Sequence, residues 1–487
     1  MKLFKKFASF VLAFAMVMAI AMPSVVKAEG NGSITITDAK AGHTFEAYQI
    51  FAGDVSGKTL SNLKWGSGVT KAGQTALGNA KDKVSNLKND KDAETFAYEV
   101  SQYLATAAKE TNVYNDGDYV INGLAPGYYL VKDKDGTVPQ GQAYTKFILM
   151  VVGSATAKVK SDVPTSEKKV KDTNDTTGET TNWQDSADYD IGDTVPFQLT
   201  GTVADDYYVY KGAYQLVFHD TLSKGLTLDK DSFKVYKNDE NGVLDQNQYK
   251  VSITDDQHFT VTIKNVKDLG GDVEKVRVEY TAKLNDKAAI GSKGNPNTMF
   301  MEFSNNPNST QGEDKGQTPE DTVIVFTYKT IVNKVKSDGK PLQGAEFTLY
   351  KNINGNYEKI TKVLGTENDG TTFTFTGLDD GEYKLEETVT PEGYNTMDPM
   401  KFSITASHET EAAEPKLTGL NGKIANGEIE FTANKDKGTL TANVVNYKGS
   451  ELPSTGGMGT TVLYAAGVIL ILAAGAFLVM QKKAENK

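Results

Sequence analysis

The stretch TFTFTGLDDGEYKLEETVTPEGY, residues 372–394, shows the pattern that decides the fold. Phe and Thr alternate, Gly and Asp interrupt the alternation, and a second run follows in which Tyr383 and Leu385 are again two residues apart. Alternation with a period of two places successive side chains on opposite faces of a strand, and Gly and Asp are turn formers. The stretch therefore predicts two β-strands joined by a short turn.

Similar runs rich in Val, Ile, Thr, Tyr and Phe recur along most of the chain, and short strands with frequent turns are typical of all-β sandwiches. The clearest runs are SITIT, HTFEAYQIF, KFILMVV, VPFQLTGTV, YQLVFHD, FTVTI and VRVEYTAKL. One segment differs: in residues 93–110 apolar side chains fall on one helical face, and Asp92 can cap the helix. We expect an all-β chain with a helical insertion in its first domain.

The two ends of the chain carry targeting signals. Three lysines precede an apolar run over residues 7–22, and small residues near Ala28 suit signal peptidase, so residues 1–28 are predicted to be a signal peptide cut after Ala28. Residues 461–480 contain no charge in 20 positions, enough for a helix to cross a bilayer, and two lysines follow at once. The body between these signals is predicted to lie outside the cell.

The composition of this exported body excludes several functions. Without residues 1–28 and 456–487 it has 427 residues with 45 basic and 62 acidic side chains, a net charge of −17, which does not suit nucleic-acid binding. It has no cysteine, so any covalent bracing must come from a reaction other than disulfide formation. The four histidines are scattered, and no zinc-protease, serine-hydrolase or P-loop motif is present. We expect no turnover enzyme and assign no cofactor or metal.

Two polar segments, residues 157–169 and 304–321, interrupt the strand pattern and predict domain junctions. The predicted order is a signal peptide, three tandem Ig-like β-sandwich domains and a C-terminal sorting segment. The corresponding ranges are 1–28, 29–160, 161–328, 329–450 and 451–487.

The sorting segment begins with Leu452, Pro453, Ser454, Thr455 and Gly456. This pentapeptide, followed by an apolar span and a basic tail, resembles the cell-wall sorting signal read by sortase transpeptidases of Gram-positive bacteria. Pro stiffens an extended segment, and the small Gly leaves the preceding carbonyl open to attack. The resemblance implies that a sortase cuts between Thr455 and Gly456 and passes the acyl group to an amine; the alternative is an ordinary membrane anchor with an accidental motif.

Motifs inside the domains extend the resemblance. YKLEETVTPEGY (383–394) resembles the E-box of sortase-assembled pilus subunits, and residues 333–351 together with VVNYKGSELPSTGG resemble the opening and closing strands of collagen-adhesin B-type domains. The chain as a whole resembles the major pilins, which form the shafts of such pili.

The resemblance implies a self-formed isopeptide bond between Lys334 and Asn446, promoted by Glu387. Burial favours a neutral, nucleophilic amine and a protonated acid; the amine attacks the Asn amide carbon, the acid relays protons, and ammonia leaves. Glu386 is the rival acid, but Glu387 lies two residues after Leu385 and so shares its face of the strand.

In the second domain PTSEKKVKD, FHDTLSKGLTL and GNPNTMFMEFSNNP resemble strands of the collagen-adhesin A-type middle domain of pilins, and the matching positions are Lys168, Asp220 and Asn297. Lys168 shares strand phase with Val170, which favours it over Lys169. Asn305 and Asn306 are the rivals of Asn297, and His219 is the sequence neighbour of Asp220. His219 has the opposite phase to Asp220 and is expected to point elsewhere.

The first domain departs from this pattern, because Asp133 occupies the place of the acid but the closing strand has no Asn. No isopeptide bond is predicted there.

Polymerisation needs an acceptor amine on the next subunit. By position Lys160 corresponds to the pilin-motif Lys, although Val159 and Ser161 replace the usual Pro and Asn, and Lys158 is the nearest rival. The expected partners are a pilus-specific sortase, identical subunits joined head to tail, minor tip and base pilins, and peptidoglycan. Host cell or matrix ligands are further candidate partners, and a wall-anchored monomeric adhesin is the alternative function.

Overall fold

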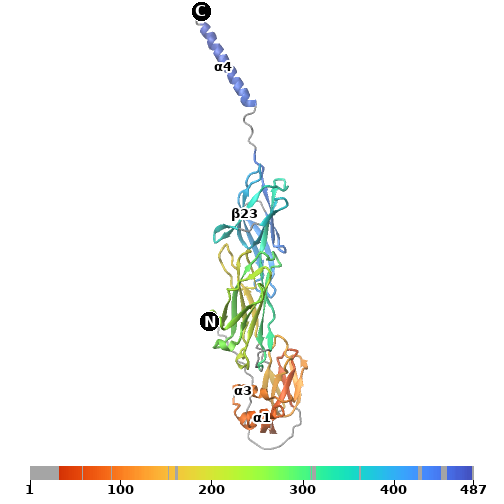
Figure 1. Cartoon of the computed structure of the whole chain (residues 1–487). Helices are drawn as coiled ribbons and strands as arrows, with labels where there is room; N and C mark the ends of the chain where they lie inside the picture. The colour runs from red at the N-terminus through yellow and green to blue at the C-terminus, as the bar shows by residue number, and fades with distance from the viewer. Residues whose placement is uncertain are drawn as a thin grey trace, which may run out of the picture.

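The protein is described by a computed structural model over residues 32–56, 59–88, 90–151, 153–158, 163–307, 309, 314–360, 364–425, 430–450 and 458–484. Figure 1 shows three β-sandwiches arranged end to end, with a long helix, α4, beyond the last one. We call them the first, middle and C-terminal sandwich. The predicted signal peptide, the pentapeptide 452–456 and Lys160 lie outside the described residues.

The first sandwich pairs a sheet of order β5-β6-β1-β9 with a sheet of order β3-β2-β7-β8, to which β4 adds at β2. Its strands are β1 (Gly32–Thr37), β2 (Phe45–Ser56), β3 (Thr59–Trp65), β4 (Lys109–Thr111), β5 (Tyr114–Asn115), β6 (Asp118–Leu124), β7 (Gly127–Asp133), β8 (Lys146–Val151) and β9 (Ser154–Lys158). Its helices are α1 (Lys71–Leu77), α2 (Ala80–Ser85), α3 (Asp90–Val100) and the 3-10 turn η1 (Ser101–Tyr103).

The helix expected over residues 93–110 is shorter than predicted. It begins at Asp90, so Asp92 lies inside it rather than capping it, and it ends at Val100 before a 3-10 turn and strand β4. Its buried side chains include Phe96 and Val100, which pack against the second sheet. The predicted helix was too long because Lys109–Thr111 pairs with β2, which satisfies backbone groups that a longer helix would have used.

The middle sandwich pairs a sheet of order β10-β12-β18-β14, with β15 on β18, and a sheet of order β11-β21-β19-β13-β17-β16, with β20 on β19. Its strands are β10 (Ser166–Val170), β11 (Ser186–Asp188), β12 (Thr194–Thr202), β13 (Leu216–Leu222), β14 (Leu226–Leu228), β15 (Lys234–Lys237), β16 (Tyr249–Ile253), β17 (His258–Ile263), β18 (Lys275–Leu284), β19 (Asn295–Ser304), β20 (Lys315–Gln317) and β21 (Asp321–Phe326). Two 3-10 turns accompany them: η2 (Tyr207–Val209) and η3 (Val266–Leu269).

The C-terminal sandwich pairs sheets of order β25-β26-β22-β31-β30 and β24-β23-β27-β28-β29. Its strands are β22 (Tyr328–Lys336), β23 (Glu346–Ile353), β24 (Asn356–Lys359), β25 (Leu364–Glu367), β26 (Thr372–Leu378), β27 (Gly381–Val389), β28 (Met400–His408), β29 (Leu417–Ile424), β30 (Thr432–Asn434) and β31 (Thr439–Asn446). The first strand, β22, and the last, β31, run parallel to each other. The stretch 372–394 forms β26 and β27, which lie in opposite sheets.

The alternation in the sequence is the alternation of burial. Along β18 every second side chain from Val276 to Leu284 is buried, and Phe373 and Phe375 of β26 point into the C-terminal core. This confirms the predicted all-β class, because a sandwich needs one apolar face on each strand.

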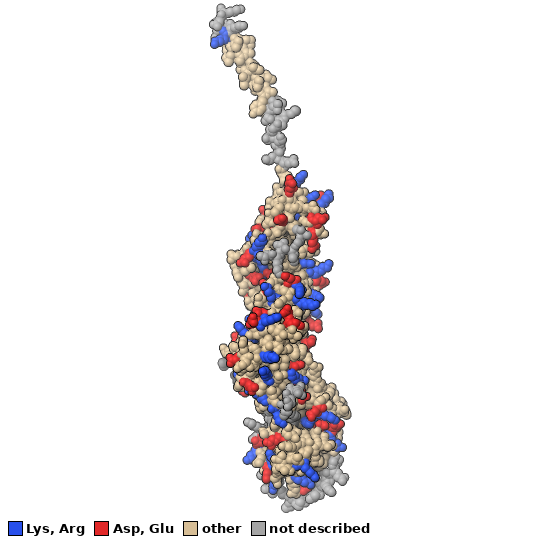
Figure 2. Space-filling view, viewed as in Figure 1, with Lys and Arg blue, Asp and Glu red and all other residues tan. Residues whose placement is uncertain are grey.

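Beyond the C-terminal sandwich, α4 (Met458–Ala484) contains a 20-residue stretch, Leu463–Lys482, of mean hydropathy 2.5 in which no residue is buried against the sandwiches. Its length and composition allow it to cross a membrane. In Figure 2 the sandwiches carry interspersed acidic and basic side chains, whereas this helix is almost free of charge until its far end.

Candidate crosslinking sites

The middle sandwich brings Lys168, Asp220 and Asn297 into one buried cluster. They come from β10, β13 and β19 respectively, and are exposed by 0%, 2% and 0%. Each lies in the core-facing phase of its strand. Because β10 belongs to one sheet and the other two strands to the facing sheet, the cluster spans the sandwich.

Lys168 Nζ donates to Asp220 Oδ2 and, over 2.9 Å, to the hydroxyl of Tyr280. Asn297 Nδ2 donates to the same hydroxyl over 2.8 Å, and that hydroxyl donates to Asp220 Oδ1 over 3.1 Å. The phenol oxygen therefore joins the amine, the acid and the amide. The carbonyl oxygen of Asn297 is buried without a hydrogen-bond partner, which leaves it ready to accept a proton from a neutral acid.

Tyr280 is a site residue that sequence reasoning missed. It lies on β18, and its ring stacks with Phe197 at a centroid distance of 5.4 Å; Lys168 Nζ lies 5.3 Å from the Tyr280 centroid. In the sequence Tyr280 is one core-phase aromatic among many, and only the pairing of β18 with β12 sets it beside Lys168. The signal that could have found it is its phenol, since a buried Tyr hydroxyl usually has a polar partner.

Burial shifts the two ionisable partners toward their neutral forms. Desolvation lowers the pKa of the Lys168 amine, against the opposing charge of Asp220, and it raises the pKa of the Asp220 carboxyl. A neutral amine is a nucleophile, and a protonated carboxyl can polarise a carbonyl. Both shifts favour the protonation states that amide attack requires.

The C-terminal sandwich assembles Lys334 of β22, Glu387 of β27 and Asn446 of β31. Their exposed fractions are 0%, 9% and 1%. Lys334 and Asn446 lie on neighbouring parallel strands, two positions out of register, and Glu387 reaches them from the facing sheet. The acid here lies opposite the strands that it would help to join.

Lys334 Nζ donates to Asn446 Oδ1 and lies 3.3 Å from Glu387 Oε1. Asn446 Nδ2 donates to Glu387 Oε1 over 2.7 Å and to Oε2 over 3.0 Å. The carboxyl therefore contacts both the nitrogen that must lose protons and the nitrogen that must gain one. Desolvation also lowers the pKa of Lys334, against the charge of Glu387.

The rival residues of both clusters have partners outside the clusters. Lys169 pairs with Asp185 at 2.6 Å, and Glu386 pairs with Lys384 at 2.6 Å. Asn305 donates to the carbonyl oxygen of Gln142 over 3.2 Å, and Asn306 donates to Asp314 over 2.9 Å. None of these contacts involves a cluster residue.

Two histidines, His219 and His43, lie near acids that the sequence analysis singled out, and their contacts differ. His219 stacks on Phe300 at 4.5 Å and lies 3.4 Å from Glu302, away from its neighbour Asp220. In the first sandwich Asp133 is buried and pairs with His43 Nδ1 at 2.6 Å. Asp133 therefore has an imidazole beside it where the other two acids have a lysine.

Comparison with known protein families matches two segments in the C-terminal part of the chain. Residues 329–418 match the prealbumin-like fold domain family, and residues 444–487 match the LPXTG cell wall anchor motif. The first match contains Lys334 and Glu387, and the second contains Asn446 and the predicted pentapeptide.

Similarity to single proteins extends over the whole chain. The trypsin-resistant surface T6 protein of Streptococcus pyogenes serotype M6 is 26% identical over 548 aligned positions, covering 95% of this chain and 97% of that protein. Two solved structures share the fold. The T6 backbone pilin of serotype M6 S. pyogenes matches at a TM-score of 0.59 and 20% identity, over 88% of this chain and 100% of its own. The full-length major pilin SpaD of Corynebacterium diphtheriae matches at 0.51 and 20%, over 86% and 98%.

A chain of tandem β-sandwiches that ends in an LPXTG anchor is a surface protein anchored to the cell wall. Within that class, the prealbumin-like domain and the 26% identity to the T6 protein over 95% of the chain make this protein similar to the Gram-positive pilins.

Proposed function

We propose that the chain is the shaft subunit of a covalently polymerised pilus, stabilised by one isopeptide bond in the middle sandwich and one in the C-terminal sandwich. The observation that carries the proposal is the pair of buried clusters, each with a lysine, an acid and an asparagine in mutual contact or joined through one phenol. Burying a lysine and an acid together costs free energy. A chemical role therefore explains two such clusters in one chain better than a role in stability alone.

Each bond forms in a single turnover. The lone pair of the Lys Nζ attacks the Asn Cγ, the acid passes protons from the amine to the departing Asn Nδ2, and ammonia leaves as the new C–N bond is completed. Glu387 contacts both nitrogens in its cluster, and Tyr280 links them to Asp220 in the other. The protein is a reactant in this chemistry and a substrate of sortase, rather than a turnover enzyme.

The polymer follows from where the two residues to be joined lie along the chain. The pentapeptide 452–456 follows the C-terminal sandwich, and Lys160 lies between β9, which ends at Lys158, and β10, which begins at Ser166. Joining Thr455 of one subunit to Lys160 of the next gives a head-to-tail contact that does not close, and such contacts generate fibres. Minor subunits at tip and base and attachment to peptidoglycan complete the proposed assembly.

Intact mass spectrometry tests the two internal bonds. The folded chain should weigh less than its sequence by two ammonia molecules, about 34 Da. Asn297→Ala and Asn446→Ala should each remove one of the two deficits, and the double variant should remove both. A wild-type chain at its full sequence mass would refute both clusters.

A second experiment tests polymerisation. Cells expressing the wild type should yield wall-derived ladders that resist boiling in detergent, and Lys160→Ala should abolish them while Lys158→Ala leaves them intact. Peptide mapping of the fibres should find a Thr455–Lys160 branch. Wall-anchored monomers without ladders would instead favour the monomeric adhesin, and ladders unaffected by Lys160→Ala would contradict this acceptor.

A further inference from the structure

The junction between the middle and C-terminal sandwiches gathers seven carboxylates from both. They are Asp172, Asp175, Asp188, Asp190, Asp193, Asp379 and Asp380. Among the described residues, two cationic side chains, Lys351 and His408, form ion pairs with these carboxylates. Lys351 pairs with Asp175, Asp190 and Asp379. Asp172 and Asp188 face His408 instead.

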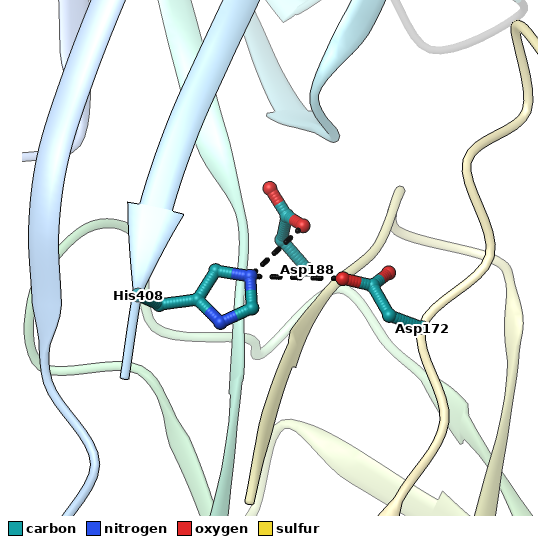
Figure 3. A group of neighbouring side chains, drawn as sticks. All are labelled: Asp172, Asp188 and His408. Carbon is teal, nitrogen blue, oxygen red and sulfur yellow. Dashed lines mark ion pairs between the residues drawn. The ribbon is translucent and has the colours of Figure 1, made fainter. Parts of the chain in front are cut away.

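These three side chains come from separate elements (Figure 3). Asp172 follows β10, Asp188 ends β11, and His408 ends β28 of the neighbouring sandwich. His408 Nε2 points between the two carboxylates, 3.6 Å from Asp172 Oδ2 and 3.5 Å from Asp188 Oδ1. One ligand atom of each residue lies within 4.8 Å of the others.

Those separations are too long for good hydrogen bonds, which measure about 2.7–3.2 Å. They match the spacing of ligand atoms around a metal ion. With tetrahedral metal–ligand bonds of about 2.0–2.1 Å, neighbouring ligand atoms lie about 3.3–3.4 Å apart.

The other imidazole nitrogen is held in the tautomer that a metal needs. Ser186 Oγ lies 2.6 Å from the carbonyl oxygen of Glu409 and 2.7 Å from His408 Nδ1. A carbonyl can only accept, so the single Ser186 hydroxyl proton goes to Glu409 and His408 Nδ1 must donate to Ser186. Nε2 is then the ring nitrogen that faces the two aspartates, and a metal ion bound there would replace its proton, as in metal-binding histidines.

Asp188 supplies an independent indication of a cation. It is only 3% exposed, and its Oδ2 has no hydrogen-bond partner. The hydroxyl of Tyr328, whose pKa is raised by burial and by the nearby Asp188, also makes no hydrogen bond within normal geometry. Oxygens of Asp379 and Asp380 lie within 4.8 Å of Asp188, so further carboxyl groups lie beside this buried side chain. A buried carboxylate oxygen without a hydrogen-bond partner is costly, and a bound cation would offset that cost.

We propose that Asp172, Asp188 and His408 bind one divalent transition-metal ion of the Zn²⁺ type at this junction. Two carboxylate oxygens and Nε2 supply three ligands and leave the fourth position to water. The imidazole selects such an ion over Ca²⁺ and Mg²⁺, which prefer ligand sets made of oxygen alone. Because the ligands come from both sandwiches, the ion fastens one sandwich of the rod to the next.

Equilibrium dialysis of the full-length chain in detergent micelles against Zn²⁺ alone, read by elemental mass spectrometry, tests the proposal. One Zn²⁺ per chain is expected, and His408→Ala should remove it. The matched control is His258→Ala, because His258 is an exposed histidine paired with Asp255 at 2.8 Å. Ser186→Ala keeps all three ligands but frees the imidazole, and its Zn²⁺ affinity should fall about tenfold.

A second readout does not depend on a variant that folds. Co²⁺ bound to the wild type should give the intense visible absorption of a four-coordinate site, and Zn²⁺ should displace it. A weak octahedral spectrum, Zn²⁺ binding unchanged in folded His408→Ala, or Ca²⁺ binding as tightly as Zn²⁺ would overturn the proposal. Loss of Zn²⁺ in both His408→Ala and His258→Ala would also overturn it, because the binding would then be unspecific.

Discussion

At the scale of single residues, three lysines buried in the sandwiches differ in what surrounds them. Lys168, Lys334 and Lys351 are each exposed by 1% or less. Desolvation lowers the pKa of Lys168 and Lys334, and each has an asparagine in its cluster. Burial also works against the charged form of Lys351, but the Tyr383 phenol and three aspartates outweigh it and raise the pKa of Lys351. The shifts therefore favour the neutral form of the first two amines and the charged form of the third.

Glu387→Gln keeps the shape of the C-terminal cluster but cannot relay protons, so the Lys334–Asn446 bond should not form. The chain should then lack one ammonia deficit. Because the bond would close a loop between residues 112 positions apart, its loss should lower the free energy of unfolding by about 4–5 kcal/mol. Intact mass and guanidinium unfolding measure the two effects.

The matched control is Glu386→Gln on the same strand. Its partner is the half-buried Lys384, and such pairs contribute only about 0–1 kcal/mol. The control should keep both ammonia deficits. A Glu387→Gln chain that also kept both would show that Glu387 is not the promoting acid.

Tyr280→Phe removes the hydroxyl that joins Lys168, Asn297 and Asp220 but keeps the ring. The middle crosslink should form about 10²-fold more slowly, the effect expected when one positioned hydrogen-bonding group is lost from a reacting centre. Mass spectrometry at intervals after synthesis follows the reaction. Tyr189→Phe, which loses a 2.7 Å hydrogen bond to the carbonyl oxygen of Lys171 in the same sandwich, should react at the wild-type rate. Equal rates for all three chains would remove Tyr280 from the reaction.

At the scale of elements, the two clusters join different kinds of strand pair. In the C-terminal sandwich the proposed bond ties neighbouring parallel strands, β22 and β31, within one sheet. In the middle sandwich it ties β10 to β19 across the two sheets. Strand β31 leads directly toward the pentapeptide 452–456, so pull on Thr455 would pass from β31 into β22 through the crosslink.

The loop between β11 and β12 carries a carboxyl with a strongly shifted pKa. Burial, together with the charges of Asp190 and Asp175, raises the pKa of Asp193 to about 6, and Lys351 opposes the shift. The folded state therefore holds a proton that the unfolded chain releases near pH 4. Stability from this group is present below about pH 4 and is lost as the pH rises through about 6.

Asp193→Asn should make the unfolding free energy independent of this titration. The variant should be more stable than the wild type at pH 7 by roughly 2 kcal/mol, and the difference should vanish below about pH 4. The amide oxygen can still accept the 3.0 Å hydrogen bond from the Asp190 N–H. Chemical unfolding at several pH values tests this, and a constant difference at all pH values would contradict it.

A control with the opposite sign is Asp255→Asn. Hydrogen bonds from the Gln257 N–H and from His258 lower the pKa of Asp255. As the pH rises, Asp255→Asn should therefore become less stable relative to the wild type, whereas Asp193→Asn becomes more stable relative to it.

At the scale of the whole molecule, the rod depends on the contact between its middle and C-terminal sandwiches (Figure 1). Lys351 lies 2.8 Å from Asp175 and 2.7 Å from Asp190 of the middle sandwich, and 3.2 Å from Asp379 of its own. The side chain of Lys351 is 2% exposed, so this is a buried ion-pair network across the junction.

Lys351→Met should therefore uncouple the two sandwiches. Removing one partner of a buried network leaves uncompensated charge and costs about 3–5 kcal/mol. In calorimetry the transitions of the two sandwiches should separate, with the C-terminal one at lower temperature. Lys384→Met, which removes a more exposed pair, should leave the profile close to that of the wild type. A single unchanged transition in Lys351→Met would show that the sandwiches are held by other contacts.

The all-β class could be predicted from the sequence, because a period of two appears wherever a strand has one face in a core. The sequence also identified the LPXTG anchor and named the lysine, the acid and the asparagine of each cluster, since these depend on residue type and strand phase along the chain. Helix length was wrong, because the pattern over residues 93–110 could not show that Lys109–Thr111 would pair with β2.

Which buried groups meet depends on the tertiary structure. Tyr280 contacts Lys168 because β12 pairs with both β10 and β18 in one sheet, and it contacts Asp220 and Asn297 because the other sheet faces it. Lys351 differs from Lys334 because middle-sandwich aspartates surround it. The contact of Ser186 with His408 spans 222 positions along the chain and crosses a domain junction. No local periodicity encodes such a contact, since it depends on how two finished sandwiches dock.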